Sequence, residues 1–360
     1  MSIFKNYFIF FLNLIFFLLG LFFNFYFLFI FLGFFFFIRF KLKSNYLYFL
    51  ISIIFFTLFL FELTFRDKIS ESDYITINNI DYDIDKKYGY HPAKNKIFKE
   101  EIFYKKKLIK DNTYTINEYG HRKLENKNNH SKCIIFHGGS ITFGQSLDDK
   151  ETLPYLTGKF FRNNYDTFNF AFNGYGPHQF LSKLENLDLE EVNNCKEVFI
   201  IYLYIHDHIA RVAGKRSWGD KSPRYININN DLIQKGFFSD FPFKFIMKVR
   251  KNFRDSKVLN TIYNLEKINN EDMKIHLMIL KKIENISKKR FLKTNFIYLV
   301  WKRNFNINRE LDNFFKNKRL IYIDDLKIDE RYKSNKIPGD NHPTKEFNII
   351  LAKEIKNLFE

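Results

Sequence analysis

The sequence predicts an α/β domain built on a parallel sheet, preceded by two transmembrane helices and a small β-rich lead-in. Three observations predict this arrangement. The chain has 47 Phe residues, concentrated in the first 65 residues, where two long runs are almost wholly apolar. From about residue 132, apolar runs of strand length alternate with segments able to form helices. The region between these two parts is polar and rich in Tyr, Asn and Lys, a composition that favours short strands and turns.

The two apolar runs at the start of the chain predict a membrane anchor over residues 1–66. The first run, Tyr7–Ile38, contains no charged residue and exceeds the roughly 20 residues that cross a bilayer core. It is also longer than the apolar region of a cleaved signal peptide, and no small-residue cleavage site stands out. The second run, Tyr46–Phe65, has the length of one crossing, with Glu62 near its end. We therefore expect transmembrane helices at about residues 7–38 and 46–65, the first of them tilted or broken.

Charge around these runs indicates the side of the membrane on which the rest of the chain lies. The connecting segment RFKLKSN carries Arg39, Lys41 and Lys43 and no acidic residue. Short basic loops stay in the cytoplasm, which places both chain ends outside. Arg66 and Lys68 on the far flank weaken this bias. We expect the C-terminal part to be periplasmic or extracellular.

The net charge of +17 first suggests a nucleic-acid partner, but the distribution of the charge argues against one. The lysines are scattered among Asn, Ile and acidic residues, and no nucleic-acid-binding motif is present. Enrichment of Lys, Asn, Ile and Phe together is typical of A/T-rich coding sequence. Interaction with an anionic surface polymer or a lipid headgroup would also explain the positive charge.

The chain from residue 67 is expected to form a β-rich lead-in over residues 67–130 and one α/β domain over residues 131–360. Continuous apolar strands alternating with helices are typical of a parallel sheet with helices on both faces. The spacing of apolar residues after Thr344 predicts a final helix that Thr344 caps. The predicted strands are CIIF (133–136), TFNFAF (167–172), EVFIIYLYI (197–205), NFIYLV (295–300) and RLIYID (319–324).

Polar motifs follow these strands, at the sheet edge where active sites of parallel α/β proteins lie. They are HGGS (137–140), NGYGPHQ (173–179), HDHIAR (206–211) and DNHPT (340–344). A serine hydroxyl becomes a nucleophile when a base takes its proton and an acid orients that base. Ser140, His342 and Asp340 can supply these three groups, with Asp324 and Asp325 as alternative carboxylates. The backbone N–H groups after the Gly-Gly turn, and that of Gly174, can bind a developing oxyanion.

Three of these segments resemble, in order, the sequence blocks of the SGNH (GDSL-type) hydrolase superfamily. They are HGGSITFGQSLDDKETLPYLTGK, NFAFNGYGPHQ and DNHPT, spread over roughly residues 132–360. The resemblance implies a flavodoxin-like three-layer α/β/α sandwich. It also implies that Ser140 is the nucleophile, that His342 is the base and that Asp340 is its acid. The N–H groups of Ser140 and Gly174 would then form part of the oxyanion hole. No metal or cofactor is implied.

The sequence departs from the family pattern at two positions. Gly139 replaces the aspartate of the family name, at a position that is not catalytic. His206 stands where the family has an asparagine that donates to the oxyanion, and an imidazole N–H could donate instead if its protonation allows. A structural hydrogen-bond network around His206 and His208 is an alternative, and their spacing argues against a metal site.

Several other side chains have two interpretations. Cys133 and Cys195 each open an apolar run, and they could pair in an oxidising compartment if their strands are neighbours. Two buried thiols is the interpretation that we favour. Three further side chains could line a substrate cleft, although such residues more often lie in the core or on the surface. They are Arg211, Trp218 and Trp301.

Together these inferences predict a membrane-anchored serine esterase of SGNH type. Its expected substrate is an acyl ester, most simply an acetyl ester, of a carbohydrate or lipid, as is common in the family. Two alternatives remain open at this point. The first is an O-acyltransferase of a cell-surface glycan that uses the same triad. The second is a catalytically weak, membrane-tethered binding or assembly protein.

Overall fold

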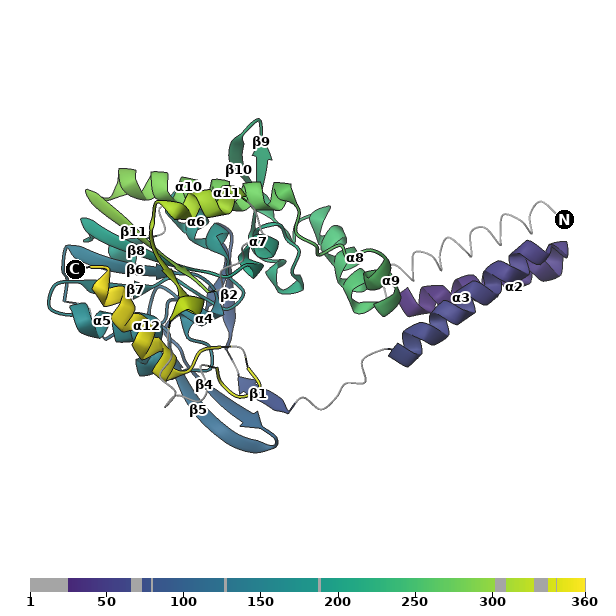
Figure 1. Cartoon of the computed structure of the whole chain (residues 1–360), viewed down its shortest axis with the longest axis horizontal. Coiled ribbons are helices and arrows are strands. Elements are labelled where there is room, and N and C mark those ends of the chain that lie inside the picture. Colours follow the sequence, from purple (N-terminus) through teal and green to yellow (C-terminus); the bar gives the residue numbers. More distant parts are fainter. Residues whose placement is uncertain are drawn as a thin grey trace. The chain divides into compact units, whose positions relative to one another are not determined.

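The computed structural model describes residues 25–65, 73–78, 80–125, 128–186, 189–301, 309–326, 336–340 and 342–359. These residues divide into two compact units, and Figure 1 labels most of their helices and strands. The helical unit comprises the described parts of residues 1–70 and 239–267. The α/β unit comprises the described parts of residues 71–238 and 268–360.

Two apolar helices pack against each other in the helical unit. The side-chain hydroxyl of Ser52 donates to the carbonyl oxygen of Gly33 (2.7 Å), and a Cβ atom on Gly33 would lie 3.1 Å from the ring of Phe56. Any larger residue at position 33 would therefore push against the ring of Phe56. The helices of this unit are α2 (Phe25–Lys43), α3 (Tyr46–Phe65), α8 (Phe243–Asp255) and α9 (Lys257–Ile262).

Of the two predicted transmembrane helices, the described residues contain one candidate. Among the described helices, only α3 is long and apolar enough to cross a membrane, over Tyr46–Thr64. Most of the first predicted span, residues 7–24, lies outside the described residues. The helix α2 continues past the predicted end at Ile38 to Lys43, so the basic residues 39, 41 and 43 lie on a helix rather than in a loop. Only Ser44 and Asn45 connect the two helices.

The α/β unit contains the predicted parallel sheet. All its pairings are parallel, and the strand order is β12-β11-β8-β6-β7. The first strand along the chain therefore lies between the second and the third, as in flavodoxin-like sheets, where ligands bind at that reversal of order. The strands are β6 (Lys132–His137), β7 (Asp166–Asn169), β8 (Glu197–Tyr204), β11 (Lys293–Val300) and β12 (Arg319–Tyr322).

Four of the predicted strands differ from the observed ones by only one or two residues at their ends, but β7 stops three residues early. The Asn169 side chain ends this strand. Its Oδ1 accepts from the backbone N–H of Ala171 (3.1 Å), and its Nδ2 donates to the carbonyl oxygen of Thr142 (3.2 Å). The apolar residues after Asn169 thus belong to the loop that leads toward the site.

Helices cover both faces of the sheet, because successive strand side chains point to opposite faces. Cys133 and Ile135 pack with α6 and α10, whereas Ile134 and Phe136 pack with α5 and α12. Thr344 caps α12 as predicted, accepting from the N–H of Phe347 (3.4 Å). The helices are α4 (Ser140–Phe143), α5 (Leu153–Phe161), α6 (Pro177–Glu185), α7 (Asp207–Val212), α10 (Asn270–Arg290), α11 (Arg309–Lys316) and α12 (Lys345–Asn357), with 3-10 turns η1 (Asp149–Glu151), η2 (Glu190–Val192), η3 (Ser217–Gly219) and η4 (Ile323–Asp325).

The polar lead-in forms short antiparallel strands that belong to the α/β unit. A three-stranded sheet has the order β1-β4-β5, and β2 pairs with β3. Buried aromatic residues Tyr90 and Tyr114 from this region pack with Phe143 of α4 and Phe172. The lead-in strands are β1 (Tyr74–Asn78), β2 (Tyr82–Asp85), β3 (Gly89–Pro92), β4 (Ile97–Tyr104) and β5 (Lys107–Thr115); a separate hairpin is formed by β9 (Pro223–Ile228) and β10 (Asp231–Phe237).

The two cysteines form a disulfide, which corrects the preferred interpretation of two buried thiols. Their Cα atoms are 5.7 Å apart. The strands β6 and β8 are neighbours, with Cys133 opposite Val198, so the chain just before β8 carries Cys195 alongside Cys133. Strand order decides this pairing, and a single sequence does not reveal strand order.

Replacing both Cys133 and Cys195 by Ala should lower the free energy of unfolding by about 2–4 kcal/mol, because the disulfide closes a long loop in the unfolded chain. Urea unfolding of the full chain in detergent measures this loss. Wild-type protein treated with reductant is the matched sample and should unfold at the same urea concentration as the variant. Equal stability of oxidised wild type and variant would contradict the prediction.

Candidate active site

Ser140 lies where the central strand β6 passes into the short helix α4. Gly138 has a φ of 152°, and a Cβ atom there would lie 2.5 Å from Oγ1 of Thr142. A Cβ atom on Gly139 would lie 2.6 Å from Nη1 of Arg211. Gly138 is thus required for the tight turn that presents Ser140 at the carboxyl edge of the sheet, and a side chain at residue 139 would displace Arg211.

The structure brings Ser140, His342 and Asp340 into one hydrogen-bonded chain. The Nε2 atom of His342 is 2.8 Å from Oγ of Ser140, and its Nδ1 atom is 2.8 Å from both carboxylate oxygens of Asp340. With the carboxylate accepting from Nδ1–H, Nε2 is left to accept from the serine hydroxyl. This is the arrangement in which an imidazole can take the proton of an attacking serine. The alternative carboxylates Asp324 and Asp325 lie exposed in η4.

Two hydroxyl groups from other segments hold the carboxylate of Asp340. Tyr74 on β1 donates to Oδ2 (3.1 Å), and Ser146 after α4 donates to the same oxygen (3.0 Å). Burial raises the pKa of Asp340, but the hydrogen bond and charge of His342, with the two hydroxyl donors, outweigh it and leave this pKa below its ordinary value. Burial is also the main cause that raises the pKa of Tyr74 to about 12, so its hydroxyl remains a donor.

The loop before Asp340 packs against the lead-in sheet. Gly339 has a φ of 77°, and a Cβ atom there would lie 2.7 Å from Cβ of Tyr74 and 3.0 Å from Cδ2 of Tyr104. Tyr74 and Tyr104 face each other in the register of β1 and β4. The lead-in therefore forms one wall of the loop that carries the acid and the base.

A buried arginine of the lead-in fastens the segment after Ser140. The Arg122 guanidinium donates to the carbonyl oxygens of Phe143 (3.1 Å), Gly144 (2.6 Å) and Leu147 (2.6 Å). It also donates to the carbonyl oxygen of Thr113 and the carboxylate of Asp149. These bonds hold in place the turn that presents the Ser146 hydroxyl to Asp340.

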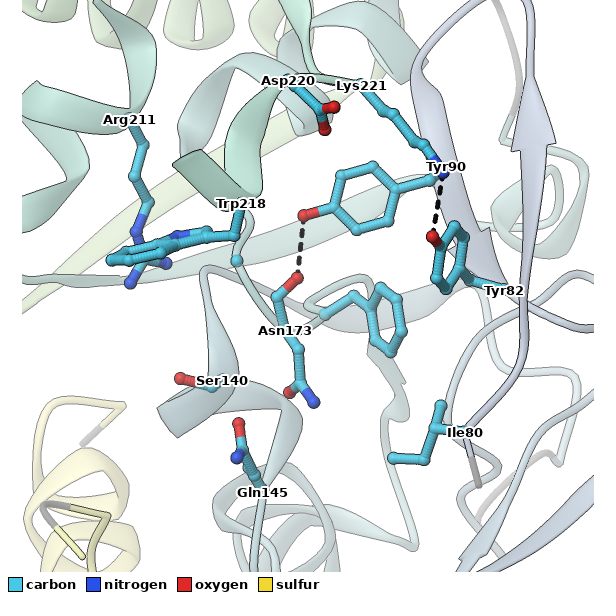
Figure 2. Close-up of a pocket in the computed structure, with 12 residues that line it drawn as sticks. Ile80, Tyr82, Tyr90, Ser140, Gln145, Asn173, Arg211, Trp218, Asp220 and Lys221 are labelled. Atoms are coloured by element: carbon cyan, nitrogen blue, oxygen red, sulfur yellow. Dashed lines mark hydrogen bonds between the residues drawn. The ribbon is translucent and has the colours of Figure 1, made fainter. Parts of the chain in front are cut away.

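Ser140 opens onto a cavity of about 570 Å³ in the α/β unit (Figure 2). Its walls combine aromatic rings with polar groups. The hydroxyl of Tyr90 donates to the carbonyl oxygen of Asn173 (2.9 Å), and Lys221 donates to the hydroxyl of Tyr82 (2.8 Å), as the dashed lines in Figure 2 show. The lining residues are Ile80, Tyr82, Tyr90, Ser140, Gln145, Phe172, Asn173, Gly174, Arg211, Trp218, Asp220 and Lys221.

Gly174 lines this cavity together with Ser140. It has a φ of 77°, and a Cβ atom there would lie 2.7 Å from the hydroxyl of Tyr90 and 3.1 Å from Cδ1 of Trp218. Only a glycine lets the backbone pass between these two rings. The backbone of Gly174 therefore borders the same cavity as Ser140.

The structure does not bring His206 to the cavity. Its Nδ1 atom lies 3.4 Å from the hydroxyl of Tyr204, and it is not one of the cavity-lining residues. Burial lowers the pKa of His206, which favours a neutral ring. The expected role of this imidazole in the oxyanion hole therefore stays a prediction, and its contact with Tyr204 fits the alternative of a structural hydrogen-bond network.

Arg211 reaches the cavity from the same motif. Its Nε donates to Oδ2 of Asp207 (2.9 Å), and its Nη1 donates to the carbonyl oxygen of Tyr175 (2.7 Å). Arg211 and Trp218 both line the cavity (Figure 2), which is one of the two interpretations that the sequence offered for them. Trp301 instead packs against Phe347, on the sheet face covered by α12.

The histidines behind the nucleophile are buried and uncharged. Burial lowers the pKa values of His137 and His178 to about 3, and it lowers that of His208 well below its ordinary value. The Nδ1 atom of His208 lies 2.7 Å from the hydroxyl of Tyr202. Within the described ranges, no group of three or more His, Cys, Asp or Glu residues is arranged to hold a metal ion.

No family model matches the sequence, and no curated protein matches it. Solved structures show a distant likeness. A protein assigned to the G-D-S-L lipolytic family from Desulfitobacterium hafniense has 11% identity and a TM-score of 0.35, with 64% of this chain and 99% of that chain covered. A psychrotrophic esterase from Pseudoalteromonas sp. has 14% identity and a TM-score of 0.34, with 63% and 96% covered. An acetyl xylan esterase from Butyrivibrio proteoclasticus has 10% identity and a TM-score of 0.36, with 78% and 86% covered. At these identities and TM-scores, the likenesses do not assign an activity to this chain.

Proposed function

We propose that this protein is a membrane-anchored serine hydrolase of SGNH type that cleaves an acyl ester. The hydrogen-bonded chain from Asp340 through His342 to Ser140 carries the proposal, because it opens onto a cavity large enough for a small substrate. Nucleophile, base and acid are each within hydrogen-bonding distance of the next group, which is the geometric test for such a triad.

In the proposed reaction, Oγ of Ser140 attacks the ester carbonyl carbon while its proton passes to Nε2 of His342. The carbonyl π electrons move to the oxygen, and the N–H groups of Ser140 and Gly174 bind the resulting oxyanion. When the tetrahedral intermediate collapses, the C–O bond to the alcohol breaks and His342 returns the proton to the leaving alcohol. Water, activated by the same imidazole, then hydrolyses the acyl-enzyme. Asp340 orients His342 in each step.

Arg211 is proposed as the third donor to the oxyanion, in place of His206. Its guanidinium lines the cavity with Ser140 and Gly174, and its side chain is 9% exposed. The hydrogen bonds to Asp207 and to the carbonyl oxygen of Tyr175 occupy Nε and Nη1 and fix the plane of the group. An arginine held in this way needs little reorganisation when negative charge develops beside it.

The cavity walls favour a carbohydrate as the alcohol part of the ester. Trp218 and Tyr82 expose about half of their surface, 51% and 49%, and such rings can stack on the apolar face of a sugar. Asn173 contributes a polar side chain to the lining. The side chains of Asp220 and Lys221 add further polar groups. An acetyl ester of a sugar is the simplest substrate of this kind.

We also propose that the α/β unit lies on the periplasmic or extracellular side of the membrane. The disulfide between Cys133 and Cys195 is typical of oxidising compartments. The helix α3, with its large exposed apolar surface, supplies the membrane anchor.

Replacing Ser140 by Ala should abolish labelling by a fluorophosphonate probe and lower the hydrolysis of an acetyl ester by roughly 10⁴-fold or more, since the nucleophile is lost. Gel fluorescence and ester-hydrolysis assays measure the two effects. Ser131→Ala changes an exposed serine of the same unit and should behave as wild type. If well-folded wild type took up no probe, the proposed activity would be refuted. Glycan mass spectrometry separates hydrolysis from transfer: loss of Ser140 raises the acetyl content in the first case and lowers it in the second.

Replacing Tyr74 by Phe should lower kcat about tenfold with little change in KM, since a hydrogen bond to a charged group contributes about 1.5 kcal/mol. The variant lacks one donor to the ionised carboxylate, so the pKa of Asp340 should rise toward its ordinary value. Ionised Asp340 stabilises the fold above that ordinary value, and this contribution is lost as pH falls through the lowered folded-state pKa. In the variant the loss should therefore begin at a higher pH.

Steady-state kinetics and urea unfolding across the acidic range test the Tyr74→Phe prediction. Tyr104→Phe is the matched control, because Tyr104 faces Tyr74 in the same sheet and has no hydrogen bond to Asp340. Identical kinetics and acid stability in the two variants would show that Tyr74 has no special effect on Asp340.

Replacing Arg211 by Ala should lower kcat by about 10²–10³-fold, the usual effect of losing one oxyanion donor, with a smaller change in KM. Added guanidinium ion should restore part of kcat to this variant and none to Ser140→Ala. A change confined to KM, without rescue, would mean that Arg211 binds substrate but does not contact the oxyanion.

A further inference from the structure

Residues 239–267 interrupt the α/β unit between β10 and α10 and belong to the helical unit together with α3. They form the helices α8 and α9. A segment that leaves its surrounding domain to pack with an apolar membrane-spanning helix needs an explanation, because nothing in the parallel sheet requires it.

The helix α8 is amphipathic and basic. Ile246, Val249 and Phe253 recur at helical spacing on one side, and Lys244, Lys248 and Lys251 recur at the same spacing on another. Residues 239–267 carry seven Lys and Arg residues against three Asp and Glu residues. A helix with an apolar side and a lysine-rich side is typical of segments that lie in a membrane interface.

Large apolar side chains of this segment face outward. Phe241 is 89% exposed, Phe245 is 40% exposed and Ile246 is 36% exposed. Grouped exposed apolar side chains are unfavourable in water and mark a surface that is covered by something else.

The position of α8 and α9 along α3 indicates what covers them. Oγ of Ser256, the residue between α8 and α9, donates to Oε2 of Glu62 (3.0 Å), and both residues are only 3% exposed. Glu62 lies in the last turn of α3. An apolar helix that crosses a bilayer has its end turns at the headgroup level, so this contact places the start of α9 near that level.

We propose that α8 lies in the membrane interface and binds anionic lipid headgroups. Phe241, Phe245 and Ile246 enter the boundary of the acyl chains, while Lys244, Lys248 and Lys251 contact the phosphates. Each basic residue near an anionic surface contributes to binding, and buried apolar surface contributes the rest. The proposal rests on membrane anchoring by α3, which is part of the proposed function. The α/β unit would then be tethered twice, through the chain after α3 and through residues 239–267.

Depth-dependent quenching of the full chain in lipid vesicles tests this proposal. An environment-sensitive fluorophore is attached to Phe245→Cys, since both native cysteines are held in the disulfide. In vesicles of phosphatidylcholine and phosphatidylglycerol, lipids brominated on the acyl chains should quench this label. Leu292→Cys is the control, because Leu292 is an apolar residue of the α/β unit that is 85% exposed. Its label should keep its emission.

A label at Ile54→Cys in the middle of α3 tests the membrane anchor separately from the interfacial position of α8. Quenching at residue 54 but not at residue 245 would refute the interfacial position of α8 and leave the anchor intact. Absence of quenching at both positions would refute the anchor and the inference together. Replacing Lys244, Lys248 and Lys251 by Gln should reduce quenching at residue 245 in anionic vesicles and leave it unchanged in purely zwitterionic ones. An equal response in both lipids would exclude a role for anionic headgroups.

Discussion

The carboxylate of Asp340 is the group on which the rest of the site depends. An imidazole and two hydroxyls from distant segments converge on its two oxygens, from His342, from Ser146 and from Tyr74. An isolated carboxylate half-removed from water would be costly, and each donor offsets part of that cost. The same bonds fix where the imidazole points and therefore whether Nε2 meets the hydroxyl of Ser140. The parallel sheet supplies the edge on which these loops meet, and the lead-in supplies one of the donors.

Arg122 shows how the lead-in stabilises the site without reaching the cavity. A buried guanidinium is strongly destabilising unless its donors are paired. Here its five N–H donors match five hydrogen bonds, four to backbone carbonyl oxygens and one to Asp149. Its Cζ atom also lies 4.3 Å from the ring centre of Tyr114. The turn after Ser140 is thereby ordered by a residue that precedes the sheet in the chain.

The elements that could be predicted from the sequence are those with a local signal. Continuous apolar runs identified the strands, and the polar motifs at their ends contained Ser140, Asp340 and His342. Tyr74, Arg122 and Ser146 carry no such signal, because their roles depend on contacts across many residues of chain. The disulfide could not be predicted for the same reason, since it depends on β6 and β8 being neighbours. Charge alone also misplaced the end of α2, because lysines and arginines are good helix formers and continue an apolar helix readily.

The geometry around Gly139 suggests why two departures from the SGNH pattern occur together. An aspartate at this position would place its Cβ atom 2.6 Å from Nη1 of Arg211 and 3.2 Å from Nε2 of His208. A side chain at residue 139 would therefore displace the guanidinium from its present position. If Arg211 is the third oxyanion donor, as proposed, the site has no need of an asparagine donor on the turn after β8. His206 is then free to point toward Tyr204. In that case Gly139 makes room for the guanidinium of Arg211, and His206 need not contact the oxyanion.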